Sequence, residues 1–456
     1  MRDRIIECNK YNFISILEVK ARKAVNEHAT FYVKGHVAAE NDDYVLRSSE
    51  RQDVTYTALD SEGRKELFSG LVCDVKLRNE NEMRILTVES ASRSILMDDE
   101  PQIRTFQNPT MTYREVTDNM NVSEEYNFLW PKDGDRRIGS MMVQYKETDW
   151  QYAIRLAGRL GTVVVADYLL DKPYISVGMP KRAPKQGIEA ISYEVKKDVC
   201  QYRDNNTNER FAERDAIYYV VRSREIYDLC DPITFLGLPL YVYAIDTVYD
   251  GQQLEHYYTL KEAEGFFTPE LFNDDLIGAS LRGSVLDIQE DKVRVRIEGD
   301  ISQTEYKWFP YASPFTQPDG YGWYFMPEVG DEVRLQFPSV KEDEPYVSSA
   351  VHVTHGHREN PETKFIRTIY GQIIQFDPEQ ILIDDGAGSR ISLHVETGIS
   401  MDTDKFLIIG AKSNIIASAE GRIILSGGGG VVMQKDTSVV NIDDAIDISS
   451  DHTRVQ

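Results

Sequence analysis

The last hundred residues carry aliphatic residues at a fixed spacing, and this spacing restricts the possible folds more than any other feature. Successive positions are eight residues apart: Ile383, Ile391, Ile399, Leu407, Ile415, Ile423, Val431 and Val439. From Leu407 onward, the residue after each of these is aliphatic as well. Because eight is far from a multiple of 3.6, the period disfavours an amphipathic helix. A sustained period with β-branched anchors is typical of a β-solenoid.

The length of one repeat limits how such a solenoid can close. At about 3.3 Å per residue an octad extends over roughly 25 Å, which is enough for one strand and one turn. One octad therefore forms one side of a coil rather than a whole coil. Two closures fit the period: three octads of one chain, or one octad from each of three chains. In both, the eight anchors form the core of an octad region at residues 365–456.

The first 270 residues have strand patterns on both sides of one helix. Alternating β-branched and aromatic residues predict strands at residues 13–19, 30–33, 54–57 and 83–88, and again within 161–177 and 217–260. Thr148 and Gln151 have the spacing of a capping box, and Gly161 is a natural helix stop. We therefore expect a helix at residues 148–160, packed by its apolar face against the strands.

A compact β module follows a linker near residues 269–280. Val293, Val295 and Ile297 alternate with charged residues, and residues 333–337 repeat the alternation. About 80 residues of short strands with Gly and Pro turns favour a small antiparallel barrel over a sandwich. We expect this module at residues 276–355, with a polar joint at 356–364 before the octad region.

The charge balance argues against several classes of partner. The chain has 51 Lys and Arg against 75 Asp and Glu, a formal net charge of −24. Such a chain repels nucleic-acid phosphates and anionic lipid, so neither is an expected partner. No apolar run has the length of a membrane helix, and the charged first ten residues do not resemble a signal peptide. We expect synthesis and assembly in the cytoplasm.

Two histidine-containing segments are the most prominent candidates for a metal site. His355 and His357, taken from three chains, could offer six imidazoles to an axial iron, and His452 with Asp451 could act similarly. A solvated loop and a surface tail are the preferred interpretations, because histidine alone does not make a site. We expect no bound metal and no cofactor.

Other chemical motifs are weak. The pairs Asp384-Asp385 and Asp443-Asp444 lack the Asp spacing and distal Glu of a calcium loop and are expected in turns. No nucleophile elbow, zinc-protease motif or P-loop occurs in the chain. Four scattered cysteines give no disulfide framework, and Cys73 and Cys200 are expected to be buried small thiols.

Several segments, in the correct order, resemble VgrG proteins and phage late-control baseplate hubs. Residues 68–72 resemble the F-x-G-x-V strand, and residues 104–108 resemble the R-x-F-Q turn that leads into a short helix at 113–116. Residues 147–157 resemble the S/T-D-W-x-F-x-x-R-L-A helix, with Tyr152 in place of the usual Phe. Residues 322–333 resemble the neck segment, with Trp308 upstream of it. With the octads, the resemblance covers nearly the whole chain.

The resemblance implies a mainly β fold in three regions. It implies two tube-type β-barrel domains with small helical insertions at residues 1–270, an OB-fold neck at 276–355 and a trimeric intertwined triple-stranded β-helix at 365–456. The implied function is a homotrimeric spike and baseplate hub of a contractile injection system. In such a hub three chains present six similar barrels to a hexamer of the inner tube protein, although the sequence itself shows no internal duplication.

The resemblance also implies partners. These are baseplate and LysM-type hub proteins, and a PAAR-type tip protein at the C-terminal end, while the target membrane is met only by mechanical piercing. A second function class stays open, namely a trimeric β-helical tailspike enzyme that degrades cell-surface polysaccharide. Narrow, uniform octads leave no room for a substrate groove, so a structural protein without enzymatic activity is expected. The sequence does not distinguish a phage tail, a phage-like bacteriocin, an extracellular injection system and a type VI system.

Overall fold

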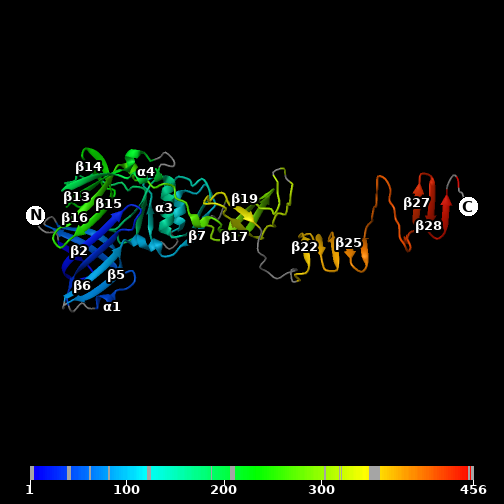
Figure 1. The fold of residues 1–456 in the computed structure, drawn as a ribbon, viewed down its shortest axis with the longest axis horizontal. Helices are drawn as coiled ribbons and strands as arrows, with labels where there is room; N and C mark the ends of the chain where they lie inside the picture. Colours follow the sequence, from blue (N-terminus) through cyan, green and yellow to red (C-terminus); the bar gives the residue numbers. More distant parts are fainter. Residues whose placement is uncertain are drawn as a thin grey trace. The chain divides into compact units, whose positions relative to one another are not determined.

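The computed structural model has two units, Met1–His352 and Val353–Gln456, which are considered one at a time (Figure 1). It describes residues 5–38, 43–60, 63–80, 83–120, 125–185, 187–205, 211–301, 305–317, 319, 321–348, 360–449 and 452. Strands far outnumber helices, so the predicted mainly β class is confirmed. Within the described part of the chain, no helix has the length and apolar character that crossing a membrane would require.

The first unit contains a large antiparallel sheet whose strands come from two separate stretches of the chain. Its strand order is β1-β4-β5-β6-β3-β2-β15-β16-β13-β12, with β14 paired to β15. The first stretch supplies β1 (Ile5–Cys8), β2 (Phe13–Ala24), β3 (Thr30–Val37), β4 (Asp53–Asp60), β5 (Gly63–Glu80) and β6 (Met83–Ala91). The second supplies β12 (Ser192–Lys197), β13 (Ile217–Ser223), β14 (Pro232–Phe235), β15 (Leu238–Tyr249) and β16 (Leu254–Lys261).

These two stretches repeat one topology. The order β4-β5-β6-β3-β2 of the first stretch matches β14-β15-β16-β13-β12 of the second, strand for strand, in the sheet and along the chain. The long strands β5 and β15 occupy equivalent places in the two stretches, and each has a register shift against the strand that follows it. The shift lies between Val72 and Asp74 on β5 and between Val242 and Ala244 on β15. Pairing of β2 with β15 joins the two halves. The fold is therefore duplicated, although the sequence pattern did not reveal it.

Further helices and short strands lie between the two halves along the chain, and one short helix lies inside each half. Helix α3 (Asp149–Leu160) begins after Thr148, whose hydroxyl accepts the Gln151 N–H at 3.2 Å while the Gln151 side chain accepts the Thr148 N–H at 3.1 Å. It ends at Gly161, which has φ 66°. The predicted helix, capping box and stop are thus confirmed. The other elements are α1 (Tyr44–Arg47), β7 (Gln102–Phe106), α2 (Tyr113–Met120), β8 (Asn127–Leu129), β9 (Met142–Glu147), β10 (Val164–Ala166), β11 (Tyr174–Val177) and α4 (Val199–Asn205).

Five short strands complete the first unit as a small barrel. They are β17 (Ser280–Gln289), β18 (Lys292–Ile297), β19 (Trp308–Pro310), β20 (Glu332–Gln336) and β21 (Tyr346–Ser348). Their order is β19-β18-β17-β20-β21, and a parallel bridge between Tyr311 and Val347 brings β21 beside β19. The predicted inward residues Val293, Val295 and Ile297 are all buried in its core. This closed order is that of an OB-fold barrel.

The second unit consists of strands paired with their neighbours in sequence (Figure 1). Its first sheet contains β22 (Lys364–Arg367), β23 (Ile373–Phe376), β24 (Gln380–Asp384), β25 (Ser389–His394) and β26 (Gly398–Thr403). Its second contains β27 (Val431–Lys435), β28 (Ser438–Ile442) and β29 (Ile446–Ser449). Residues 404–430, all of them described, belong to no strand.

Candidate functional site: an apolar face and a charged joint

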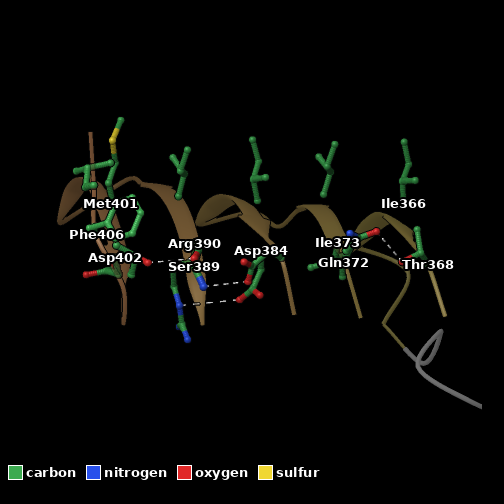
Figure 2. A pocket seen from close by; sticks show the side chains of 16 residues that line it. Ile366, Thr368, Gln372, Ile373, Asp384, Ser389, Arg390, Met401, Asp402 and Phe406 are labelled. Carbon is green, nitrogen blue, oxygen red and sulfur yellow. Dashed lines mark hydrogen bonds and ion pairs between the residues drawn. The ribbon is translucent and has the colours of Figure 1, made fainter. Parts of the chain in front are cut away.

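One face of the β22–β26 sheet carries two rows of apolar side chains that pair directly across the strands. The first row is Ile366, Ile374, Ile383, Ile391 and Met401. The second is Phe376, Ile381, Leu393 and Ile399. Figure 2 shows Ile366 and Met401 on one side of the strands and Asp384 and Arg390 on the other. The alternation of strand side chains thus gives one face of apolar rows and an opposite face of mixed character, on which Ile373 and Leu382 lie among polar side chains.

The structure brings only part of the predicted octad core together. Ile383 and Ile391 share the first row, and Ile399 lies on the same face in the second row. In the last sheet Val431 pairs with Ile442, whereas Val439 pairs with Gln434 and so points to the opposite face. The remaining three octad residues, Leu407, Ile415 and Ile423, lie in the strand-free stretch. The assignment of all eight to one core stays a prediction.

Among the described residues of the second unit, nothing covers this apolar face. None of residues 360–446, all of them described, is buried. Ile399 is 71% exposed, Ile415 61% and Ile423 56%. A hollow of about 530 Å³ lies on the β22–β26 sheet, lined by apolar side chains such as Ile383 and Ile391 and by polar ones such as Asp384 and Arg390. Since burying one such side chain contributes roughly 1.5–3 kcal/mol, a second surface that covered this face would stabilise the unit.

A second feature is a group of charged side chains that connects α3 to the OB-type barrel within the first unit. We call this group the charged joint; it consists of Glu147, Arg155, Arg159 and Glu342. Arg155 is buried, binds Glu147 through two nitrogens at 2.8 and 2.6 Å, and also pairs with Glu342 from the loop after β20. Arg159 reaches the second oxygen of Glu342 at 2.9 Å, and the N–H of Val143 donates to it at 2.8 Å. Burial lowers the pKa of Arg155, but the carboxylates of Glu342 and Glu147 outweigh burial, so the pKa is raised.

The R-x-F-Q motif contributes to the same joint. Arg104 pairs with Asp149 at the start of α3, with 2.5 Å between Nη1 and Oδ1. The Gln107 amide donates to the Val295 carbonyl at 3.0 Å and to Asp300 at 3.1 Å, both in the barrel module. The motifs that carry the resemblance therefore hold the α3 region and the barrel together. Glu342 was missed from the sequence, because nothing distinguishes it among 75 acidic residues.

The neck motif forms a tight, exposed loop. Gly322 has φ 140°, and a Cβ there would lie 2.3 Å from the Phe315 carbonyl oxygen, so only glycine fits without rearrangement. The aromatic residues around it are more than half exposed: Tyr321, Trp323, Tyr324 and Phe325. The upstream Trp308 lies in β19, and the guanidinium carbon of Arg294 is 4.4 Å from its ring centroid.

The candidate metal residues do not form a cluster in the part of the chain that can be described. His355, His357 and Asp451 lie outside the described residues, and His452 is exposed. Within the described residues there is no group of three His, Cys, Asp or Glu that could hold a metal ion.

Asp443-Asp444 lies in a turn as expected, whereas Asp384 is the last residue of β24 and only Asp385 lies beyond the strand. The cysteines correct a further expectation. Asp384-Asp385 precedes the β24–β25 connection, where backbone N–H groups of Ser389 and Ala387 lower the pKa of Asp385, and Asp443-Asp444 connects β28 to β29. Cys73 and Cys200 are exposed, so the expectation that both are buried was wrong. Cys73 lies at the register shift between Val72 and Asp74 on β5.

Comparison with known proteins shows which domain family the barrel matches and which solved structures have a similar fold. Residues 281–352 match the model of the type VI secretion system/phage-baseplate injector OB domain. No curated protein matches the chain. The E. coli c3393 protein, described as a type VI secretion component with structural similarity to T4 tail proteins gp27 and gp5, aligns with a TM-score of 0.55. That alignment has 12% identity and covers 75% of this chain and 99% of that one.

Two further solved structures are similar over most of the chain. A half-lidded Francisella PdpA-VgrG complex aligns with a TM-score of 0.55 at 8% identity, covering 88% of both chains. A lidless PdpA-VgrG complex aligns with a TM-score of 0.56 at 9% identity, covering 88% of this chain and 98% of that one. At these identities the likeness shows the fold. The resemblance read from the motifs is therefore confirmed: the chain carries an injector OB domain of the type VI and phage-baseplate kind and has the fold of VgrG-like baseplate spike proteins.

Proposed function

We propose that the protein is the structural, homotrimeric spike and hub of a contractile injection machine. The observation that carries this proposal is the second unit, in which an apolar face runs across five strands and no residue of 360–446 is buried. Such a unit gains its stability only by covering that face. Two further copies of the same chain supply matching faces around a common axis, with one sheet from each chain on each side.

The strand-free stretch supports an intertwined arrangement. Residues 404–430 contain the aliphatic pairs that begin at Leu407, Ile415 and Ile423, and every side chain of these pairs is more than half exposed. A stretch with strand-forming pairs but no partner strand in its own chain can pair with the same stretch of two other chains. The eight-residue repeat suits this arrangement, since one octad is one side of a coil.

We further propose that the duplicated sheet is the adaptor to the inner tube. Two halves of equal topology per chain give six similar halves in a trimer, which matches a six-fold tube protein. In this proposal residues 1–270 are the hub with two tube-type barrel domains, 276–355 the neck and 365–456 the stalk, which pierces the target envelope when the sheath contracts. Baseplate proteins, a LysM-type hub protein and a PAAR-type tip are the proposed partners within a phage-tail-like particle.

A structural role is favoured over the tailspike enzyme. The hollow on the β22–β26 sheet is lined in part by Ile383 and Ile391, which the proposed trimer buries, so trimer formation would reduce the space open to a polysaccharide. We expect no oligosaccharide release from cell-surface polysaccharide by the purified protein. Reproducible release, lost on mutation of an acidic pair, would favour the enzyme instead.

The proposal is tested by Ile423→Asp. The substitution places an unpaired carboxylate at three equivalent core positions, and each costs several kcal/mol because a buried charge without a partner is strongly unfavourable. We expect light scattering to show loss of the trimer.

The matched control is Ile424→Asp, the same change one residue further on. Alternate residues of a strand point to opposite faces, so this side chain projects away from the axis and the trimer should persist. A stable trimer of the Ile423→Asp protein would refute the octad-core assignment.

A further inference from the structure

A cleft of about 390 Å³ lies where the β7–β9 ribbon meets the barrel strands β17 and β20. Its lining includes two pairs of residues that face each other across neighbouring strands. Arg282 and Arg334 lie directly opposite each other on β17 and β20. Ile103 and Tyr145 lie directly opposite each other on β7 and β9. The cleft therefore has one cationic wall and one apolar wall.

The alternation of the barrel strands turns both arginines outward. Leu281 and Leu335, their neighbours along β17 and β20, form another direct pair and are buried in the barrel core. Adjacent residues of a strand point to opposite faces, so Arg282 and Arg334 project together from the outer face. Directly opposite residues have Cβ atoms about 4.5–5.5 Å apart, which lets two guanidinium groups reach the same anion.

The two guanidinium groups have no carboxylate partner in the part of the chain that the structure describes. No described Asp or Glu lies within 4.0 Å of Arg282 or Arg334, whereas Arg294 on β18 pairs with Asp287 at 3.9 Å. Like charges directly opposite each other destabilise a sheet. Because the chain has 75 acidic residues, a carboxylate partner was readily available to such a pair. The facing arginines indicate a site for an anion from outside the chain.

The apolar wall is held in place beside the arginines. Ile103 is 41% exposed, and Tyr145 packs partly against the barrel core. The Thr105 N–H donates to the Gly299 carbonyl at 3.2 Å, and the Ile301 N–H donates to the Thr105 carbonyl at 3.1 Å. Gly299 has φ 81°, and a Cβ there would lie 2.8 Å from the Ile103 carbonyl oxygen. Glycine thus permits the close approach that sets the distance between the two walls.

Glu298 limits the charge that the cleft accepts. It belongs to the lining, and its backbone N–H donates to the Arg282 carbonyl at 2.8 Å. Two guanidinium groups and one carboxylate leave one net positive charge in the cleft. A single carboxylate balances this charge, whereas a phosphate dianion would exceed it and be repelled by Glu298. The volume is near the lower end of the range for ligand pockets, so the ligand is small or is the end of a chain.

We propose that the cleft binds the C-terminal residue of a partner protein that ends in an apolar side chain. Such a residue carries a carboxylate and an apolar side chain on the same carbon atom, which is the combination that the two walls accept. The carboxylate lies between Arg282 and Arg334 in charge-assisted hydrogen bonds, and the side chain lies against Ile103 and Tyr145. The cleft is separate from the large sheet and the octad region on which the proposed function rests.

The test is the binding of short peptides to the full chain, measured by isothermal titration calorimetry. The probe is acetyl-Ala-Ala-Phe with a free carboxylate, and its matched control is the same peptide with a C-terminal amide. We expect the free acid to bind at least about tenfold more tightly, because hydrogen bonds to an ionised group are stronger. Equal binding of the two peptides, or no binding of the free acid, would overturn the proposal.

Substitutions test the cationic wall. Arg282→Gln and Arg334→Gln should each weaken binding of the free acid by about tenfold. Arg296→Gln is the matched control, since Arg296 is exposed on the neighbouring strand β18 but does not line the cleft. Its affinity should equal that of the native protein. None of the three arginines is buried, so the thermal unfolding transition should not change. Equal weakening by all three substitutions would mean that the peptide binds by general charge attraction.

Two further peptides test the apolar wall and the position of the carboxylate. Ile103→Ala should weaken binding of the Phe-ended acid but leave that of acetyl-Ala-Ala-Gly unchanged; an equal effect on both would contradict an apolar wall. The peptide acetyl-Ala-Asp-Phe with a C-terminal amide carries its carboxylate inside the chain and should bind no better than the amide control. Binding as tight as that of the free acid would overturn the C-terminal assignment. The proposed trimer would stand in either case.

Discussion

At the scale of single residues, the α3 motif contains one hydroxyl that the fold does not use. Tyr152 is fully buried and stacks on Phe106 with ring centroids 6.2 Å apart. Its hydroxyl has no hydrogen-bond partner among the residues that the structure describes. By contrast, the buried Tyr126 hydroxyl donates to Asp149. The resembled family usually has Phe at the position of Tyr152, and burial of an unpaired hydroxyl gives a physical reason for that preference.

We expect Tyr152→Phe to leave the free energy of unfolding unchanged or to raise it, since it removes a buried polar atom without a partner. Tyr126→Phe makes the same chemical change but removes the hydroxyl that donates to Oδ2 of the buried Asp149, and should lower the free energy of unfolding by about 1–3 kcal/mol. Urea unfolding followed by tryptophan fluorescence measures both. Equal destabilisation by the two substitutions would show that the Tyr152 hydroxyl is paired after all.

A buried lysine in β2 makes stability depend on pH. The Lys23 ammonium donates to the Leu67 carbonyl at 2.7 Å, and burial lowers the pKa of Lys23 to about 8. An unfolded lysine has a pKa near 10.4, so between these values the unfolded chain binds more protons than the folded one. Stability therefore rises with pH over this range, by up to about 1.4 kcal/mol per pH unit from this group.

Lys23→Met should remove that contribution. The urea midpoint of the native protein should therefore rise relative to that of the variant between pH 8 and pH 10. Lys20→Met is the matched control, because Lys20 is on the same strand with its side chain 62% exposed. Its midpoint should follow that of the native protein across the same range. An identical pH profile for Lys23→Met would mean that Lys23 is charged in the folded chain.

At the scale of elements, α3 is both the most predictable helix and the part that depends most on distant residues. Its caps are local and were predicted from Thr148, Gln151 and Gly161. Its contact with the barrel through Arg155 and Glu342 joins positions 187 residues apart and leaves no pattern in the sequence. Local hydrogen bonds are encoded next to the residues that form them, whereas the identity of a distant partner is not.

Arg155→Met should lower the free energy of unfolding by about 3 kcal/mol, because it leaves Glu342 buried with one cation fewer. The double variant Arg155→Met with Glu342→Gln should recover part of that loss, since the amide carries no charge. Limited proteolysis between residues 269 and 280 reports separately whether the barrel has come loose from α3. Additive effects of the two single substitutions would contradict a shared buried pair.

The sheets show the same division between local and distant information. The barrel strands alternate residue by residue, and Val293, Val295 and Ile297 are buried as predicted. The pairing of β2 with β15 was not predictable, because more than 200 residues separate the two strands and no sequence pattern in either strand identifies the other. In the octad region the period places Ile383 and Ile391 in one row, but the short β25–β26 connection sets the next register and brings Met401 into that row.

At the scale of the whole molecule, the two units differ in what holds them together. Residues of the first unit form four clusters of buried apolar side chains, and the second unit has no buried residue among 360–446. The first unit therefore has the means to fold by itself. In the proposed trimer, the second unit gains its buried surface from other copies of the chain.

We expect a chain ending at His352 to retain the thermal unfolding transition of the first unit, because its buried clusters are complete. The isolated segment from Val353 should be an unfolded monomer at low concentration and gain strand structure only as its concentration rises. Circular dichroism across a dilution series measures both. A segment that stays folded on dilution would show that its strands are stable without a partner.

The absence of a buried core in the second unit also sets the order in which the proposed particle is built. Bringing three separate chains together at the stalk would be a rare event at cellular concentrations. Once three first units have associated, each C-terminal segment is tethered close to the other two, at an effective concentration of roughly millimolar. The stalk then forms almost as an intramolecular reaction, after the hub has assembled. A single unassembled chain is therefore not expected to form part of the stalk.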